Sequence, residues 1–150
     1  MRQVLDPVQF GLIQAHVTLC RDDELEGLDP AMVQRRLEAN GVKPITLAFG
    51  QAERFSTHGV LLPCIAGEDE FQALRQLILG SETIRRQPPH ITLAHPRNPK
   101  SPGNSLAAAA NIGAEVRIRF TTVCRIQQDA GAPWQVLQRF ALAAAEDSDA

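Results

Sequence analysis

Residues 12–20 read LIQAHVTLC, and apolar and polar side chains alternate along this stretch. In an extended chain, neighbouring side chains point to opposite faces, so a period of two is the pattern of a half-buried β-strand. The polar face carries Gln14, His16 and Thr18, and Gln14 is placed to orient the ring of His16. The apolar face consists of Ile13, Ala15, Val17 and Leu19. We therefore predict a strand over residues 12–20 with an open polar face and a buried apolar face.

The elements after this strand are predicted from capping residues and periodicity. Asp29 suits a helix N-cap, Pro30 suits the first helical turn and Gly41 suits the C-terminal stop, so a helix is expected over residues 30–40. Gly80 suits the end of a second amphipathic helix. The remaining elements of this first unit are strands at 45–49 and 60–65 and a helix at 68–79.

Residues 88–96, PPHITLAHP, open a second unit with the same alternation. His90 and Thr92 fall on one face of the predicted strand, and Ile91 and Leu93 fall on the other. The elements expected after it are a short Ala-rich helix from about Ser105, a long strand through 116–120 and a last strand over 134–142. Both halves of the chain thus read strand–helix–strand–strand, which indicates an internal duplication.

This repetition predicts an α+β fold with antiparallel sheets and flanking helices. The expected architecture is one bilobal domain over residues 1–150, in which two pseudo-symmetric β-α-β-β units face a central cleft. The first lobe takes about residues 1–80, the second about 81–145, and residues 146–150 form an acidic tail.

Two H-x-T-L motifs carry the chemistry of the sequence, and each sets a histidine and a threonine on one strand face. Two imidazoles flanking a phosphodiester can act as a pair, one taking a proton from the attacking oxygen while the other protonates the leaving oxygen. Threonine hydroxyls can donate hydrogen bonds to the phosphoryl oxygens as charge builds there. We therefore predict that His16 and His90 are catalytic. Thr18 and Thr92 are predicted to bind the substrate phosphate. The sequence leaves open which of the two histidines is the acid and which is the base.

A zinc site that uses both histidines is the alternative reading of the same residues. No cluster of carboxylates or thiolates stands at ligand spacing, and metal binding leaves the threonine of each motif unexplained. The sequence therefore predicts no metal and no cofactor.

At these residues the sequence resembles the two-histidine phosphoesterases, a family that includes RNA 2′,3′-cyclic phosphodiesterases and enzymes named RNA 2′,5′-ligases. The resemblance rests on His16-Val17-Thr18-Leu19 and His90-Ile91-Thr92-Leu93, and extends to GVLLPCIAG and the ending GAPWQVLQRFAL. It implies a bilobal α+β fold, a central cleft holding the four motif residues, and a reaction that needs neither metal nor ATP. Members of the family usually have a further strand before the first motif, and the expectation here is that this strand is absent.

The composition limits the other possibilities. With a net charge of −2, the chain is not a general nucleic-acid coat protein. Cys20, Cys64 and Cys124 lie far apart and form no C-x-x-C pair, which argues against a disulfide framework and suits a reducing cytoplasm. No apolar run approaches the roughly 20 residues that span a bilayer, and the N-terminus does not look like a secretory signal. We expect a cytoplasmic protein without a membrane partner, and a monomer rather than an oligomer.

Several other residues are candidates for a role beside the motifs. Arginines around the second motif are candidates for phosphate contact, although ordinary solvated arginines are expected; they are Arg85, Arg86 and Arg97. His95 is expected at the end of the second motif strand and His58 at the surface. Trp134 can stack on a base, but the core is the more usual place for a large aromatic ring.

Three functions remain open from the sequence. The first is hydrolysis of a 2′,3′-cyclic phosphate or another 2′-linked phosphodiester of RNA or a nucleotide. The second is a module that binds nucleotides or RNA ends without turnover, which has no need for a matched acid–base pair. The third is ATP-independent 2′-5′ RNA ligation, which uses the same residues in reverse.

Overall fold

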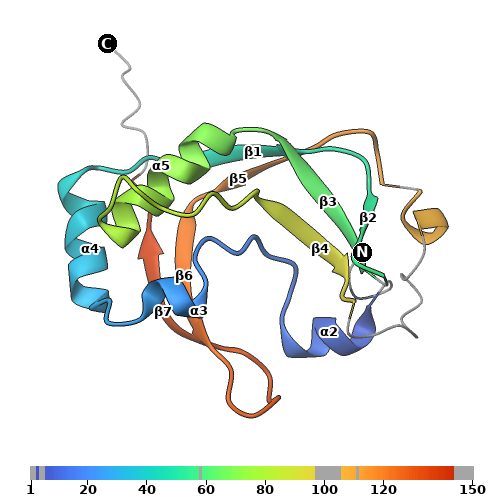
Figure 1. The fold of residues 1–150 in the computed structure, drawn as a ribbon, viewed down its shortest axis with the longest axis horizontal. Helices are drawn as coiled ribbons and strands as arrows, with labels where there is room; N and C mark the ends of the chain where they lie inside the picture. Colours follow the sequence, from blue (N-terminus) through green and yellow to red (C-terminus); the bar gives the residue numbers. More distant parts are fainter. Residues whose placement is uncertain (1–2, 4–5, 58, 97–105, 111, 144–150) are drawn as a thin grey trace.

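Strand β1 (Ile45–Phe49) contributes to the core, with Leu47 1% exposed and Phe49 fully covered. The computed structural model describes residues 3, 6–57, 59–96, 106–110 and 112–143. Within that part of the chain, helices are combined with antiparallel strands (Figure 1). The predicted α+β class is therefore confirmed.

The main sheet has five strands with β3 (Gly59–Ala66) at its centre. β3 pairs antiparallel with β1, with β2 (Glu53–Phe55) and with β4 (His90–Ala94), and β1 pairs in turn with β5 (Val116–Phe120). The sheet therefore takes strands from both halves of the sequence, and the strand of the second motif lies beside the central strand of the first half. A separate two-stranded sheet is formed by β6 (Thr122–Gln127) and β7 (Gln135–Ala141).

The two long helices begin and end as their sequences predict. The side chain of Asp29 accepts a hydrogen bond of 2.9 Å from the N–H of Ala31 and caps α4 (Pro30–Ala39). α5 (Glu68–Leu79) ends at Gly80, whose φ of 67° lies in the left-handed region that favours glycine. The two helices lie side by side at one end of the sheet (Figure 1).

Apolar side chains form two clusters, with α5 shared between them. Phe71 packs with the strands of the main sheet, while Leu74 and Ile78 pack with α4 and with Phe140 of β7. The cluster under the main sheet consists of Leu47, Phe49, Val60, Leu62, Phe71, Ile91, Leu93, Ala94 and Ala109. α5 therefore fixes the small sheet and the main sheet relative to one another.

The strand predicted over residues 12–20 is wrong in extent. Leu12 ends a helix, α2 (Pro7–Leu12), and the rest of the segment forms only an isolated antiparallel bridge between Val17 and Ile91. Continuing that register toward Cys20 brings the segment opposite Pro89 and Pro88, which have no N–H to donate to a ladder. In the other direction, a register shift in the β3–β4 pairing distorts the far end of β4.

Other elements differ in smaller ways from the sequence prediction. The Ala-rich helix is a single 3₁₀ turn, η1 (Leu106–Ala109), and the long strand divides at Thr121 into β5 and β6. Short elements without strong periodicity were missed, namely α2, α3 (Asp22–Leu25) and β2. Residues 146–150 and the loop after Pro96 lie outside the described residues.

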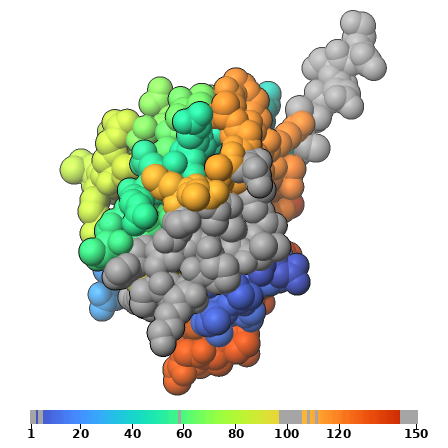
Figure 2. Space-filling model, turned by 90° about the vertical axis from the view of Figure 1, so that its right-hand side faces the viewer, coloured from blue at the N-terminus to red at the C-terminus, as the bar shows by residue number. Residues whose placement is uncertain are grey.

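The N-terminal segment lies against the tip of the β6–β7 hairpin, blue beside red-orange in Figure 2. The N–H of Trp134 donates to the carbonyl of Leu12 at 2.9 Å, and Trp134 is half-buried there rather than in a core cluster. Asp6, fully buried, caps α2 and accepts a hydrogen bond of 2.9 Å from the N–H of His95 at the end of β4.

Among the described residues, no helix has the length and apolar character needed to span a membrane.

Candidate active site

The structure brings the two H-x-T motifs together through their middle residues. Val17 and Ile91 form an antiparallel bridge. In that register His16 lies across from Thr92, and Thr18 lies across from His90. Directly opposite residues in an antiparallel pair have Cβ atoms about 4.5–5.5 Å apart, so each histidine neighbours the threonine of the other motif.

The two imidazole rings are held in the same way. Nδ1 of His16 lies 2.8 Å from the main-chain oxygen of Gln14, and Nδ1 of His90 lies 3.1 Å from that of Pro88. A carbonyl oxygen only accepts hydrogen bonds, so Nδ1 carries the proton and donates in both rings. In the neutral ring the lone pair is then on Nε2. Gln14 therefore does contact His16, but through its backbone, and both motifs use the carbonyl two residues before the histidine.

The burial of the motif residues matches the predicted faces for the second motif and only partly for the first. His90 and Thr92 are half-buried, while Ile91 and Leu93 are buried in the core. His16 is half-buried and Thr18 is exposed. The apolar neighbours Val17 and Leu19 pack against the core clusters but stay half-buried, so their predicted full burial is wrong. One bridge, rather than a full ladder, leaves this segment at the margin of the sheet.

The sheet face that carries His90 and Thr92 also carries an apolar floor and two arginines. Pro63 pairs with His90, and the ring of Phe55 lies over Gly59 with its centroid 6.3 Å from the His90 ring. On β5, Arg117 and Arg119 are exposed and alternate with residues that pack against the core. Because strands lie about 4.8 Å apart, three strand steps separate these arginines from β4 by roughly 15 Å.

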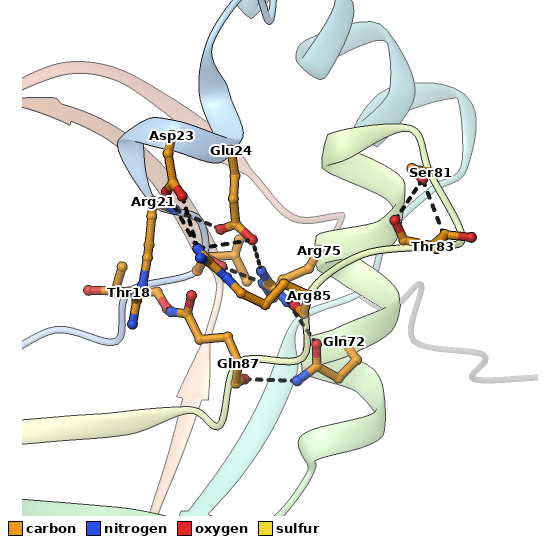
Figure 3. A network of polar contacts seen from close by, with 11 residues as sticks. Thr18, Arg21, Asp23, Glu24, Gln72, Arg75, Ser81, Thr83, Arg85 and Gln87 are labelled. Atoms are coloured by element: carbon orange, nitrogen blue, oxygen red, sulfur yellow. Dashed lines mark hydrogen bonds and ion pairs between the residues drawn. The ribbon is translucent and has the colours of Figure 1, made fainter.

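Beneath the first motif lies a network of buried polar groups that the sequence patterns did not reveal (Figure 3). Arg75 of α5 is fully buried, and its Nε donates to the carbonyl of Leu19 at 2.8 Å. Its other donors reach the carbonyl of Arg85 at 2.6 Å, the side-chain oxygen of Gln72 at 3.0 Å and the carboxylate of Glu24 at 2.5 Å. Arg75 stands four residues after Phe71 on the buried face of α5, and a charged residue on such a face was the available signal for a buried ion pair.

Gln87 completes the network from the segment just before the second motif. It is 5% exposed, and its Nε2 donates to the carbonyl of Thr18 at 2.8 Å. Its own carbonyl accepts a hydrogen bond of 2.8 Å from the side chain of Gln72. The main chain of the first motif is therefore bonded to side chains from α5 and from the α5–β4 connection (Figure 3).

Glu24 is ionised more easily than an ordinary glutamate. Burial of the side chain opposes the charged form, but hydrogen bonds from the Arg21 N–H and from Arg75, with the charges of Arg75 and Arg85, outweigh it and lower the pKa of Glu24. The carboxylate is therefore a stable anion opposite the buried guanidinium at neutral pH.

The other residues singled out in the sequence have different positions. Arg85 pairs with Asp23 and Glu24, and Arg86 pairs with Glu68, so both arginines contact carboxylates in this structure. His95 follows the last residue of β4, as predicted. His58 and Arg97 lie outside the described residues.

The described part of the chain has two surface hollows away from the motifs and no cluster of metal-binding side chains. Two surface hollows lie around the C-terminal end of α5 and the chain that follows it, and no motif residue lines either of them. No group of three or more histidine, cysteine, aspartate or glutamate side chains is arranged there to hold a metal ion.

Cys20, beside the first motif, is expected to resist thiol reagents. Burial raises the pKa of the Cys20 thiol to about 11, despite the opposing charge of Arg75. A raised thiol pKa leaves less reactive thiolate at neutral pH. At pH 7.5, iodoacetamide should label the exposed Cys124 first and Cys20 last, as read by peptide mass spectrometry. Labelling of Cys20 at the rate of Cys124 in the folded protein would contradict the burial of this segment, and urea-unfolded protein is the control.

Comparison with protein-family models identifies the family of the chain. The family model described as the 2′-5′ RNA ligase superfamily matches residues 1–131, which include both motifs, the network and all of β1–β6. A search of curated proteins found no match.

Proposed function

Because the chain belongs to the 2′-5′ RNA ligase superfamily, whose members are the two-histidine phosphoesterases, we propose that it opens a 2′,3′-cyclic phosphate or another 2′-linked phosphodiester at the end of an RNA or in a nucleotide. His16 and His90 are the acid–base pair, and neither metal nor ATP takes part. The bridge between Val17 and Ile91 is the observation that carries the proposal, because it sets each histidine across from the threonine of the other motif.

The reaction follows from the tautomer of the two rings. With Nδ1 donating to a backbone carbonyl, Nε2 of one neutral imidazole accepts a proton from the attacking water as its oxygen bonds to phosphorus. Nε2–H of the other, protonated imidazole donates to the ribose oxygen as its bond to phosphorus breaks. Both proton transfers accompany a single displacement at phosphorus. The product is a phosphomonoester. The two rings have then exchanged protonation states.

Thr18 and Thr92 stabilise the charge that builds on the phosphoryl oxygens. Each hydroxyl stands two residues from its own histidine and across the bridge from the other one. A donor that is held in place before the charge develops needs little reorganisation, which is the condition for effective electrostatic stabilisation.

The pairing of the motifs also supports the pseudo-symmetric arrangement. An antiparallel pair has a local two-fold axis between its strands, and here that axis relates His16 to His90 and Thr18 to Thr92. We propose that the two halves of the domain face one another about this axis, with the reacting phosphorus atom close to it.

The face beyond β4 favours an RNA end as the substrate. The apolar floor at Pro63 and the Phe55 ring can stack on a base next to the reacting ribose, and Arg117 and Arg119 can contact a phosphate further along the strand. A binding module without turnover and the reverse ligation on RNA ends are the competing functions, and both would use this same face.

A substrate panel measured with and without EDTA tests the proposed function. We expect turnover of cyclic-phosphate-ended oligoribonucleotides or of 2′,3′-cyclic nucleotides that is unchanged in EDTA, because imidazoles and hydroxyls do the chemistry. For the oligonucleotides, kcat/KM should fall as salt is raised from 50 to 200 mM, more steeply than for a mononucleotide, because arginine–phosphate contacts are screened.

The panel separates the competing functions by its products. Loss of activity in EDTA that zinc or manganese restores would mean that the histidines are metal ligands. Tight binding of cyclic-phosphate-ended RNA without any product would favour the binding module, and 2′-5′-joined strands from a 5′-hydroxyl end would favour ligation.

A further inference from the structure

The segment of the first motif is held mainly by hydrogen bonds from side chains rather than by pairing with β4. Within the described residues, this segment meets β4 in a single bridge at Val17. Beyond this bridge, the carbonyls of Thr18 and Leu19 accept hydrogen bonds from the side chains of Gln87 and Arg75, each at 2.8 Å. In this register Pro89 and Pro88 lie opposite Leu19 and Cys20, and neither has an N–H group with which to extend the ladder.

Both donors are rigidly placed. Arg75 has no exposed surface and contacts four partners, so its guanidinium has one orientation. Gln87 is fixed from behind by the Gln72 side chain, which donates to its carbonyl. A donor that is already immobilised can define the position of the chain it bonds.

We infer that Gln87 and Arg75 are positioning residues that set the first motif against the second, an inference that rests on the proposed function. Gln87 bonds the carbonyl of Thr18 and precedes His90 by only three residues, so one short segment fixes both motifs. A displacement of about 1 Å in a reacting group can lower a rate by about 100-fold, so this contact controls kcat rather than substrate affinity.

Gln87→Met isolates the contact. It keeps the length of the side chain and removes the donor to Thr18, while the other amide atom, Oε1, makes no hydrogen bond within the described structure that could be lost. Gln76→Met is the matched control, because Gln76 lies on α5 and donates 3.0 Å to the carbonyl of Glu82, away from the motifs. We expect kcat to fall about 10- to 100-fold in Gln87→Met with KM within about twofold, and neither to change in Gln76→Met.

Gln87→Glu adds a readout that a purely structural role would not produce. The ionised carboxylate would face the Thr18 carbonyl without a proton, whereas the protonated acid can donate in place of the amide. Burial raises the pKa of a carboxyl group, so the protonated fraction of the introduced glutamate increases as the pH falls. The ratio of kcat for Gln87→Glu to kcat for the wild type should therefore rise as the pH falls, and the same ratio for Gln76→Glu should stay flat.

A structural readout keeps this inference separate from the proposed function. If the wild type turns over no substrate, the proposed function fails, and NMR signals of the His16 ring and the Thr18 methyl group still report on positioning. Gln87→Met should shift both signals and Gln76→Met neither. Unchanged signals, or a loss of kcat equal in the two methionine variants, would overturn the inference.

Discussion

Replacing either motif histidine with alanine is expected to lower kcat/KM by about 10²- to 10⁴-fold, the range that a single proton-transfer catalyst contributes. His16 and His90 are both half-buried on a face opposite to the core, so neither ring fills a space in the hydrophobic clusters. The variants should therefore keep the wild-type midpoint of urea unfolding. The measurement is kcat/KM for the substrate that the panel identifies, with circular dichroism as the control for folding.

The double variant His16→Ala/His90→Ala is expected to be little worse than either single variant. Acid and base act in one displacement, so removing one group already removes most of what the other contributes. Multiplicative losses in the double variant would mean that the two rings act independently. A single variant with wild-type turnover would exclude that histidine from the acid–base pair.

The threonines provide a graded comparison on the same face. Thr18→Ala and Thr92→Ala should each cost about 2–4 kcal/mol of transition-state stabilisation, the effect of losing one preorganised donor. Because the two residues are equivalent about the bridge, their losses should be similar in size.

The wild-type rate should also be bell-shaped in pH, since one imidazole must be neutral while the other is charged.

The sequence predicted the motif faces because alternation is a local property. His90, Thr92, Ile91 and Leu93 lie as the period of two requires, and their strand is part of a continuous ladder with β3. The helices at α4 and α5 were predicted with their ends because capping residues and positive-φ glycines act within one turn.

The first motif strand was overpredicted because ladder formation is not local. The pattern of residues 12–20 is that of a strand, but a strand also needs N–H donors from its neighbour, and here Pro88 and Pro89 directly precede the neighbouring strand β4. The side chains that take over, Arg75 and Gln87, lie far along the chain from Thr18 and Leu19. No periodicity within one segment can show such a partner.

Arg75→Met is expected to have the largest effect on stability, about 3–5 kcal/mol in the free energy of unfolding. The methionine fills much of the same space but leaves the Glu24 carboxylate, 11% exposed, without its buried cation. It also leaves the carbonyls of Leu19 and Arg85 without a donor. Urea unfolding monitored by Trp134 fluorescence measures the change.

The matched control for this variant is Arg36→Met. Arg36 also reaches a main-chain carbonyl, that of Ile78, at 2.7 Å, but it lies in the partly exposed contact between α4 and α5. Its loss should cost about 1 kcal/mol, the net contribution of an ordinary hydrogen bond. Equal losses in the two variants would mean that the buried ion pair contributes no more than such a bond.

The same ion pair gives stability a defined dependence on pH, and Glu24→Gln isolates it. The folded protein lowers the pKa of Glu24 below its ordinary value of 4.5, so the ionised carboxylate stabilises the fold above that value. This contribution is lost as the pH falls through the lowered pKa, because the folded protein must then protonate Glu24. The difference in unfolding free energy between the wild type and Glu24→Gln should thus be constant from pH 7 to about pH 5 and shrink below pH 4.5. Other carboxylates titrate in both proteins and cancel in this difference. A gap that widens on acidification would show instead that burial, rather than Arg75, controls the ionisation of Glu24.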